Sequence, residues 1–363
     1  MKNTFGNNVT VTIFGESHGE AIGAVLDGMA PGIPIDNEFL EHMLSLRRPS
    51  GKISTARREP DPVQIISGVF EGVTTGTPIA IIIPNTAKKS ADYDELKTVA
   101  RPSHADYAAF CKYHGFNDYR GGGHFSGRIT AALVAAGAVA LSALKNKGIT
   151  VGTHISRIGE ICDRPFGDLD ADIAQLQTLH FPVLDEQRSK EMLAKIESAA
   201  AEGDSVGGIL ETVVKGVPAG VGEPWFDTLE GLLSHILFSI PAVKGVQFGD
   251  GFGFADQTGS EANDEFCVEN GEIKTSSNKN GGINGGISNG MPIVFSCAVK
   301  PTPSIYKEQN TVDFAEKTER KLQIKGRHDP AIIHRARAVV DAAAAIALCD
   351  ALSGRFGTDW LKG

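Results

Sequence analysis

Two long runs of small residues most constrain how this chain can fold. Residues 129–141 and residues 336–351 are rich in alanine and read as helices. Helices of this kind cannot bury large side chains of their own, and small residues serve best where neighbours pack closely on several sides. We therefore expect two central helices covered by sheets. Both runs are short for a bilayer core, and charged residues flank or interrupt them, so we expect no membrane span.

Each run follows a turn that carries arginine. Three glycines, residues 121–123, stand between Arg120 and Arg128 ahead of the first run, and residues 326–330 (Gly-Arg-His-Asp-Pro) precede the second. Helix N-termini attract anions, glycine lets the backbone approach a ligand, and arginine pairs with phosphate or carboxylate. The first turn predicts a site for an anionic small molecule. The recurrence of turn and helix suggests an internal duplication.

Composition indicates a soluble enzyme whose cysteine thiols are reduced. The 363 residues are 41% hydrophobic, and the formal net charge of −9 argues against a general nucleic-acid binder. None of the five cysteines forms a CxxC pair, and residues 1–8 lack the apolar stretch of a secretion signal, so we expect a cytoplasmic protein. No linker divides the chain. We predict one interwoven α+β domain over residues 1–363, with no metal site.

Periodicity and punctuation predict further elements. Expected strands are residues 9–14, 63–70, 79–84, 208–217 and 292–299. Expected helices are residues 37–46, 104–114 and 187–201, the last stopped by Gly203.

Two other segments, residues 245–253 and 280–290, are very rich in glycine. Such density is typical of a mobile lid or of backbone that approaches a ligand, and a plain flexible loop is the alternative. Neither segment contains GxxxxGK[ST], nor a GxGxxG between strand and helix. The sequence therefore disfavours a nucleotide triphosphatase and a dinucleotide-binding enzyme.

Six motifs, in order along the chain, closely resemble those of the chorismate synthase family. They are Gly-Glu-Ser-His-Gly at 15–19, Arg-Arg-Glu-Pro-Asp at 57–61, Ser-Gly-Val-Phe-Glu-Gly-Val-Thr-Thr-Gly-Thr at 67–77, Arg-Pro-Ser-His-Ala-Asp-Tyr at 101–107, Val-Pro-Ala-Gly-Val-Gly-Glu-Pro at 217–224 and Gly-Arg-His-Asp-Pro at 326–330. The resemblance runs from about residue 5 to about residue 350. The length resembles the compact, monofunctional bacterial form.

The resemblance implies both a fold and a reaction. The family fold is a single α+β domain in which antiparallel sheets sandwich central helices, with internal pseudo-duplication, and it assembles as a homotetramer. The implied reaction is a 1,4-anti elimination of phosphate from 5-enolpyruvylshikimate 3-phosphate, which gives chorismate. It requires reduced FMN without net redox change. The compact form takes that flavin from an external flavin reductase, and the family is also associated with NADP.

The resemblance also implies roles for single residues. His18 would lie near flavin N1 and supply or stabilise its proton, His104 would protonate the departing phosphate, and Asp329 would relay the ring proton near flavin N5. Expected substrate anchors are Arg47, Lys52, Arg101 and Arg128. Expected contacts to FMN are His124, Phe125, Ser126, Ala242, Gly285, Lys300, Pro301, Thr302, Pro303, Ser304 and Arg327.

Some positions depart from the family pattern. The glycine-rich loop has His124, Phe125, Gly127 and Ile129 where the family usually has Arg, a variable residue, Ala and Glu. Lys52 stands where many relatives have a second arginine, and Pro241 replaces a frequent asparagine. These changes affect local contacts to flavin and phosphate, because arginine forms a two-pronged contact that lysine and histidine cannot copy.

Two other functional classes are compatible with parts of this pattern. A small-molecule kinase would use glycine loops before helices, but it would need ATP, Mg²⁺ and a nucleotide-binding loop. A non-catalytic flavin or anion carrier would keep the arginines and glycines. It would have no need for His18, His104 and Asp329 in these settings.

Overall fold

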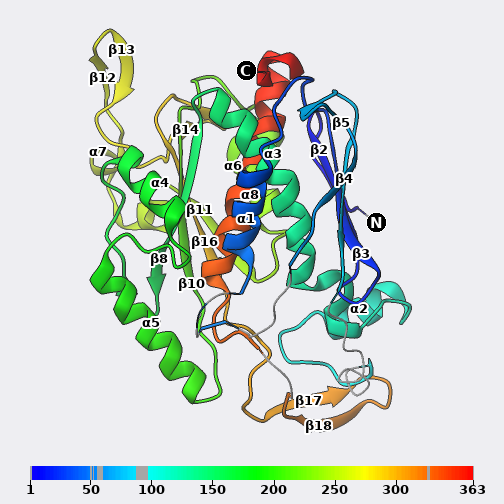
Figure 1. Ribbon diagram of the computed structural model, residues 1–363. Helices are drawn as coiled ribbons and strands as arrows, with labels where there is room; N and C mark the ends of the chain where they lie inside the picture. The colour runs from blue at the N-terminus through cyan, green and yellow to red at the C-terminus, as the bar shows by residue number, and fades with distance from the viewer. Residues whose placement is uncertain are drawn as a thin grey trace.

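The two alanine-rich segments form the helices at the centre of the molecule. They are α3 (Thr130–Asn146) and α8 (Ile333–Phe356), both longer than the sequence runs. The computed structural model describes residues 2–49, 51, 53–54, 60–86, 97–324 and 328–362, and in it the two helices pack against each other (Figure 1). The expectation of two buried central helices is confirmed, since most residues of both are buried.

The contact between α3 and α8 depends on the absence of a side chain at Gly137. A Cβ added there would lie 2.3 Å from the Cβ of Ala342 and 2.6 Å from its Cα. Real carbon atoms do not approach so closely, so the helix axes can take this separation only with glycine at 137. The alanines of α8 serve the same purpose on the facing side.

Two antiparallel five-stranded sheets flank the helices. The first has the order β1-β2-β3-β7-β4, with strands Thr4–Phe5, Thr10–Gly15, Ala21–Asp27, Ile79–Pro84 and Gln64–Ser67. The second has the order β11-β16-β10-β8-β9, with strands Val243–Phe248, Ile293–Val299, Gly208–Lys215, Thr150–Ile158 and Ile161–Cys162.

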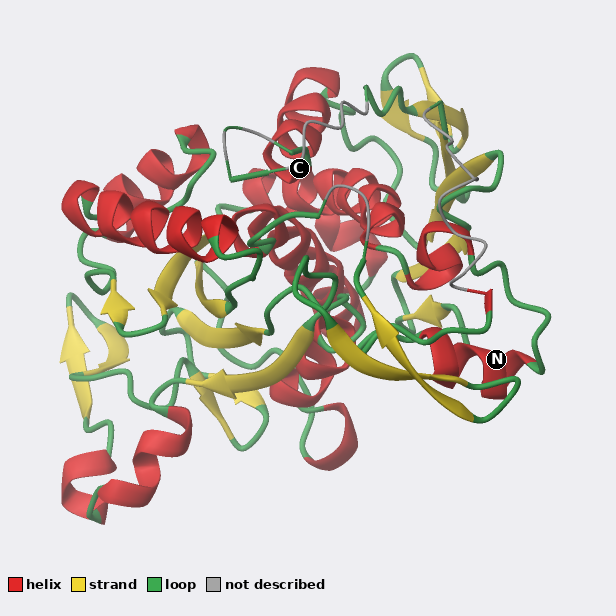
Figure 2. Cartoon of the chain, turned by 90° about the horizontal axis from the view of Figure 1, so that it is seen from below, coloured by secondary structure: helices red, strands yellow, loops and turns green. Residues whose placement is uncertain are grey.

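The helices lie between these sheets. Helix α3 contacts β2, β3 and β7 of the first sheet, and α8 contacts β8 and β10 of the second. Helices α1 (Asn37–Arg47) and α6 (Leu229–Leu237) pack on α8 in the same layer. Seen from below, the helices gather at the centre with strands on either side (Figure 2). The chain therefore has an α+β fold of helices and antiparallel sheets.

The remaining elements lie around this centre. The helices are α2 (Asp106–Tyr113), α4 (Leu169–Thr178), α5 (Glu186–Ala201) and α7 (Gly259–Ala262), with 3₁₀ turns η3 (Arg120–Phe125), η4 (Gly127–Ile129), η5 (Trp225–Asp227), η6 (Gly251–Asp256) and η7 (Thr358–Leu361). Two-strand pairs are β5–β6 (Val69–Phe70, Val73–Thr74), β12–β13 (Phe266–Glu269, Glu272–Thr275), β14–β15 (Ile283–Asn284, Ile287–Ser288) and β17–β18 (Gln309–Asp313, Thr318–Leu322).

Most elements expected from the sequence are present, with two differences. The expected strand at 63–70 is broken at Gly68, whose φ of +83° ends β4 before β5 begins. The segment 245–253 was expected to be a loop, but residues 245–248 belong to β11 and pair with β16. Pairing with a central strand outweighs the low strand propensity of its glycines.

A buried polar network ties α8 to the second sheet. Asp341 accepts a hydrogen bond from Thr153 on β8, and Thr153 is hydrogen-bonded to Thr212 on β10. Arg337 lies 3.7 Å from Asp341. It also donates to the backbone carbonyls of Leu176 and Leu179 at the end of α4. Burial raises the pKa of Asp341 to about 6, although Arg337 and Thr153 oppose the shift.

One helix of the described chain, Gly127–Asn146, is long and apolar enough to cross a membrane. However, 83% of that apolar window is buried inside the protein. Its hydrophobicity is thus explained by its place in the core, between the first sheet and α8.

We predict that Gly137→Ala lowers the free energy of unfolding by up to about 2 kcal/mol. Alanine favours a helix over glycine by about 1 kcal/mol, but overpacking against Ala342 costs about 1–3 kcal/mol. The matched control is Gly354→Ala on exposed α8 surface, where the nearest atom is the end of the Asn8 side chain. Denaturant unfolding should show the control neutral or stabilised. Equal effects of the two substitutions would contradict the packing argument.

A second prediction concerns His154, which is buried on β8. Its Nδ1 lies 2.7 Å from Asp163 Oδ2 and its Nε2 3.2 Å from Glu211 Oε1. Burial lowers its pKa, but hydrogen bonds to Asp163 and Glu211 outweigh burial and raise the pKa above 6.5. Because the pKa of His154 is higher in the folded state than in the unfolded state, protonation of His154 stabilises the fold. This contribution is fully present below the unfolded-state pKa and is lost as pH rises through the folded-state pKa.

His154→Leu should therefore cost more unfolding free energy near about pH 6 than near about pH 9. Chemical denaturation at both pH values measures the difference. The control is His114→Asn at the exposed end of α2, a position in the left-handed region that asparagine tolerates. A pH-independent loss for His154→Leu would show that the two carboxylates do not hold an imidazolium.

Candidate active site

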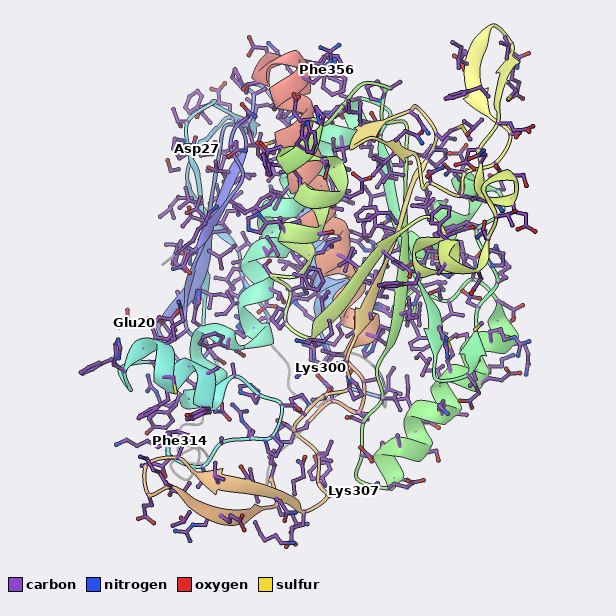
Figure 3. The ribbon with its side chains drawn as sticks, turned by 180° about the vertical axis from the view of Figure 1, so that it is seen from behind. Glu20, Asp27, Lys300, Lys307, Phe314 and Phe356 are labelled. Atoms are coloured by element: carbon purple, nitrogen blue, oxygen red, sulfur yellow. The ribbon has the colours of Figure 1, made fainter. Side chains whose placement is uncertain are left out.

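A cleft of about 1030 Å³ lies at one end of the central helices. Its wall combines residues from β1, β2, the end of α1, the glycine-rich loop, the end of α6, the start of β11, the chain after β16 and the first turn of α8. Lys300 marks this region, between the ends of the central helices and the β17–β18 hairpin (Figure 3). A cleft of this volume is at the upper end of the range for small-molecule sites.

The cleft brings together most of the residues singled out in the sequence. Those that line it are Arg47, Arg101, His104, His124, Phe125, Ser126, Arg128, Ala242, Lys300, Thr302, Pro303, Ser304 and Asp329. His18, Gly285 and Pro301 are not among the lining residues. Lys52 and Arg327 lie outside the described residues.

Two neighbouring glycines each face one of the two histidines. A Cβ at Gly121 would lie 2.3 Å from Cε1 of His18, and a Cβ at Gly122 would lie 3.4 Å from Cε1 and 3.5 Å from Nε2 of His104. Both glycines have positive φ, +58° and +83°. His18 therefore lies directly behind Gly121, which lines the cleft, and glycine is required for this close approach.

The glycine-rich loop is docked onto the end of strand β2. The backbone N–H of Ser17 donates to the carbonyl of Gly123 at 3.1 Å, and His124 Nδ1 donates to the carbonyl of Gly15 at 2.8 Å. A carbonyl only accepts, so Nδ1 of His124 carries a proton and Nε2 is the other tautomeric position. His124 thus anchors the loop.

A buried carboxylate holds the arginines of the cleft. Asp61, which is 1% exposed, forms an ion pair with Arg128 and lies 3.5 Å from Arg47 Nη1 and 3.6 Å from Arg48 Nε. Arg47 also donates to Thr130 and to the carbonyl of Gly127. These contacts fix the directions of Arg47 and Arg128, both of which reach the cleft wall.

His104 belongs to a compact group with Arg101 and Asp106. Asp106 Oδ2 accepts from the backbone N–H and Nε of Arg101, and Oδ1 lies 2.7 Å from Arg101 Nη2 and 2.6 Å from His104 Nδ1. Burial tends to raise the pKa of Asp106, but hydrogen bonds from Arg101 and His104 lower it well below its usual range. Helix α2 has Ala105 as its N-cap, so His104 does not cap the helix.

Asp329 is held by Arg335, which donates to it from the first turn of α8. Arg335 also donates to the carbonyl of Arg47 at 2.8 Å, so it links the two sides of the cleft. The helix begins at Ile333 with Ile332 as its N-cap and no side-chain cap. Asp329 therefore does not cap α8 and faces the cleft instead.

The chain after β16 adds a second cationic group. Lys300 donates to the carbonyl of Ser103, and burial followed by repulsion from Lys244 lowers the pKa of Lys300. Among the described residues, the buried hydroxyl of Thr302 has no hydrogen-bond partner. An unsatisfied hydroxyl in a cleft wall that also carries Lys244 and Lys300 suits an anionic or polar ligand.

Two non-glycine residues of the cleft wall have left-handed backbone. Ser103, which precedes His104, has φ 57°, and Ala242 has φ 76°. Such conformations cost about 1–3 kcal/mol and concentrate at functional sites.

The cleft is strongly cationic although the protein is acidic overall. Its wall carries Lys2, Arg47, Arg101, Arg128, Lys244, Lys300 and Arg335, and Asp329 is the one carboxylate among the described lining residues. A low-dielectric cleft lined by one sign of charge attracts ligands of the opposite sign. The arrangement can hold several anionic groups beside the imidazoles of His104, His124, His235 and His328 and the carboxylate of Asp329.

Neither glycine-rich segment expected to approach a ligand forms this wall. Residues 245–253 and 280–290 do not line the cleft. Gly285 is in the turn of the β14–β15 hairpin, and β14 is far from α2 in the view of Figure 1. Glycine there serves the turn, because φ is +61°.

Several site residues were not singled out from the sequence. Asp61 and Asp106 stand inside quoted motifs, and their positions close to the motif arginines were a usable signal. Arg335 and Lys244 carried no motif signal. Their part in the site depends on where α8 and β11 begin, which periodicity does not define closely.

Comparison with known proteins agrees with this site. The family model described as chorismate synthase matches residues 9–353. A chorismate synthase of Archaeoglobus fulgidus is 46% identical over 351 residues, covering 96% of this chain and 97% of that protein. One from Dehalococcoides mccartyi is 45% identical over 353 residues, covering 96% of each.

A solved structure points the same way. The crystal structure of a chorismate synthase superposes with a TM-score of 0.76 at 29% identity, covering 98% of this chain and 94% of that one. The family match, the near-complete coverage and the cationic cleft agree: this chain belongs to the chorismate synthase family of lyases.

Proposed function

We propose that the protein converts 5-enolpyruvylshikimate 3-phosphate to chorismate by 1,4-anti elimination of phosphate and a ring hydrogen, in the presence of reduced FMN. The observation that carries this proposal is the cationic cleft that has His104 and Asp329 in its wall and His18 directly behind it. The substrate bears one phosphate and two carboxylates, so several fixed cations are needed in one site.

Arg47, Arg101 and Arg128 anchor the substrate in this proposal. Each is oriented by a buried or half-buried carboxylate behind the wall, Asp61 or Asp106. An anchor that is already oriented loses little entropy on binding, and it places the reacting bonds with little freedom. Lys52, a further proposed anchor, is outside the described residues.

His104 is the proposed acid for the leaving phosphate. Charge develops on the phosphate oxygen as its carbon–oxygen bond breaks, and a protonated imidazole beside it stabilises that charge by giving a proton. The ring edge with Cε1 and Nε2 faces Gly122, on the side away from Asp106. Because Nδ1 contacts Asp106, we assign Nε2 to the phosphate.

Asp329 is the proposed acceptor of the ring proton. Its carboxylate is fixed by Arg335 at the cleft wall, so it does not need to reorient before it accepts. His18 is the proposed residue near flavin N1. Its side chain is 4% exposed and lies against Gly121, where the imidazole can hold a proton shielded from water.

The cleft also suits reduced FMN. The volume of about 1030 Å³ accommodates more than a drug-sized ligand, Phe125 and Ile129 offer apolar surface to a flat ring, and the unsatisfied Thr302 hydroxyl offers a hydrogen bond. Lys300, Pro303, Ser304, Ala242, Ser126 and His124 complete the proposed flavin wall. When bound, reduced FMN supplies electron density that is returned within each turnover, with no net redox change.

Gly285, Pro301 and Arg327 are further proposed flavin contacts. The first two do not line the cleft in a single chain, so a contact from either would need a shift of the chain or a second copy of it. Arg327 is outside the described residues.

Further parts of the proposal concern the cellular setting and assembly. All five cysteines are free thiols, which supports a reducing cytoplasm. Four further parts of the proposal rest on the family alone. They are the supply of reduced flavin by a separate reductase, association with NADP, a homotetrameric state and an internal duplication within a single domain.

An anaerobic assay tests the function. Purified protein mixed with 5-enolpyruvylshikimate 3-phosphate and reduced FMN should release phosphate and chorismate in equal amounts, with the flavin still reduced at the end. A kinase would instead need ATP and Mg²⁺, and a carrier would release neither product. Turnover with oxidised FMN and no reductant would contradict the proposed flavin requirement.

We predict that His104→Ala lowers kcat by roughly 10²–10⁴-fold, the range for a general acid, with flavin binding nearly unchanged. Steady-state kinetics and FMN titration measure the two effects. Thermal melting is the control, because His104 caps no helix and its loss should leave the melting temperature close to that of the wild type. A parallel loss of stability and activity would assign His104 a structural role.

Asp329→Asn should lower kcat by at least about 10²-fold, because an amide cannot accept the ring proton. The asparagine oxygen can still accept the hydrogen bond from Arg335, so folding, FMN binding and substrate binding should persist. Presteady-state turnover under anaerobic conditions is the measurement. Near-normal turnover would show that Asp329 is not the acceptor of the ring proton.

A further inference from the structure

Among the described residues, the hydrogen-bond donors to the side chain of Asp106 belong to Arg101 and His104. Oδ2 accepts from the backbone N–H of Arg101 at 2.9 Å and from its Nε at 2.8 Å. Oδ1 accepts from Arg101 Nη2 at 2.7 Å and lies 2.6 Å from His104 Nδ1. The carboxylate is about nine-tenths buried, so these contacts are poorly screened by water.

Nδ1 of His104 has two neighbours, and only one can be its hydrogen-bond partner. Arg101 Nη2 lies 3.0 Å away and can only donate, whereas Asp106 is 2.6 Å away and, when ionised, can only accept. The shorter, charge-assisted contact to Asp106 prevails. Nδ1 therefore carries a proton that it donates to Asp106.

This contact determines what the other side of the ring can do. With a proton fixed on Nδ1, the ring loses and regains its second proton at Nε2, the nitrogen that lies near Gly122. His104 itself lines the cleft. Backbone strain at Ser103 places this ring at the start of α2.

We propose that Asp106 is a positioning residue for catalysis, which holds His104 with its proton on Nδ1 and its acidic Nε2–H directed at the leaving phosphate. The proposal rests on the proposed role of His104 as the acid. In each turnover the proton moves from Nε2 to the phosphate oxygen, and the proton on Nδ1 stays in its hydrogen bond to Asp106.

Asparagine cannot replace aspartate here. Both oxygens of Asp106 face donors, so an amide nitrogen at either position would meet a donor. Asp106→Asn should lower kcat by at least about 10-fold, since the ring loses the acceptor that holds its proton on Nδ1.

A double-mutant cycle separates this role from an effect through Arg101. In a His104→Ala background, adding Asp106→Asn should change kcat by less than about 3-fold, because the residue through which Asp106 acts is absent. An equal loss in both backgrounds would overturn the proposal and assign Asp106 to Arg101 and substrate binding. Asp172→Asn is the matched control, since Asp172 holds Arg164 in a similar pair on α4, away from the cleft.

A second measurement needs neither turnover nor a folded Asp106 variant. In wild-type protein containing ¹⁵N-labelled histidine, with the His104 signals identified by their loss in His104→Ala, the neutral ring should keep its proton on Nδ1. A neutral ring protonated on Nε2 would overturn the proposal. Because this readout is independent of activity, it still reports on Asp106 if the protein fails to make chorismate.

Discussion

The docking of the glycine-rich loop on the end of β2 is the contact on which the rest of the site depends. Two hydrogen bonds, from Ser17 to the carbonyl of Gly123 and from His124 to the carbonyl of Gly15, join segments about a hundred residues apart. Gly121 and Gly122 then lie against His18 and His104. A Cβ at Gly121 would collide with the His18 ring, and the positive φ of Gly122 favours glycine beside His104, so one loop lies against both rings.

Behind this loop, the fold supplies a rigid support. Helix α3 leads out of the loop and packs on α8, and the start of α8 carries Arg335, which holds Asp329. The small residues of these helices, Gly137 and Ala342 above all, let the helices approach closely enough for the loop and the start of α8 to share one cleft. Buried carboxylates then orient the arginines from the protein side and leave their outer faces to a ligand.

Much of this could be predicted from the sequence, because the signals were local. Alanine content predicted α3 and α8, and alternation predicted β2. The motifs predicted most of the residues that line the cleft, whereas His18, Gly285 and Pro301 do not line it. The glycine-rich segment at 245–253 was misjudged because its strand character comes from pairing with β16. Pair partners such as Asp106 with His104 depend on side-chain geometry that spacing alone does not give.

A crystal structure with the substrate and FMN bound tests the central claim most directly. The account predicts the substrate phosphate within hydrogen-bonding distance of His104 Nε2, the carboxylates on Arg47, Arg101 or Arg128, and the flavin ring against Phe125 and Thr302. The substrate phosphate found on the far side of the cleft from His104, or either ligand bound outside the cleft, would contradict it.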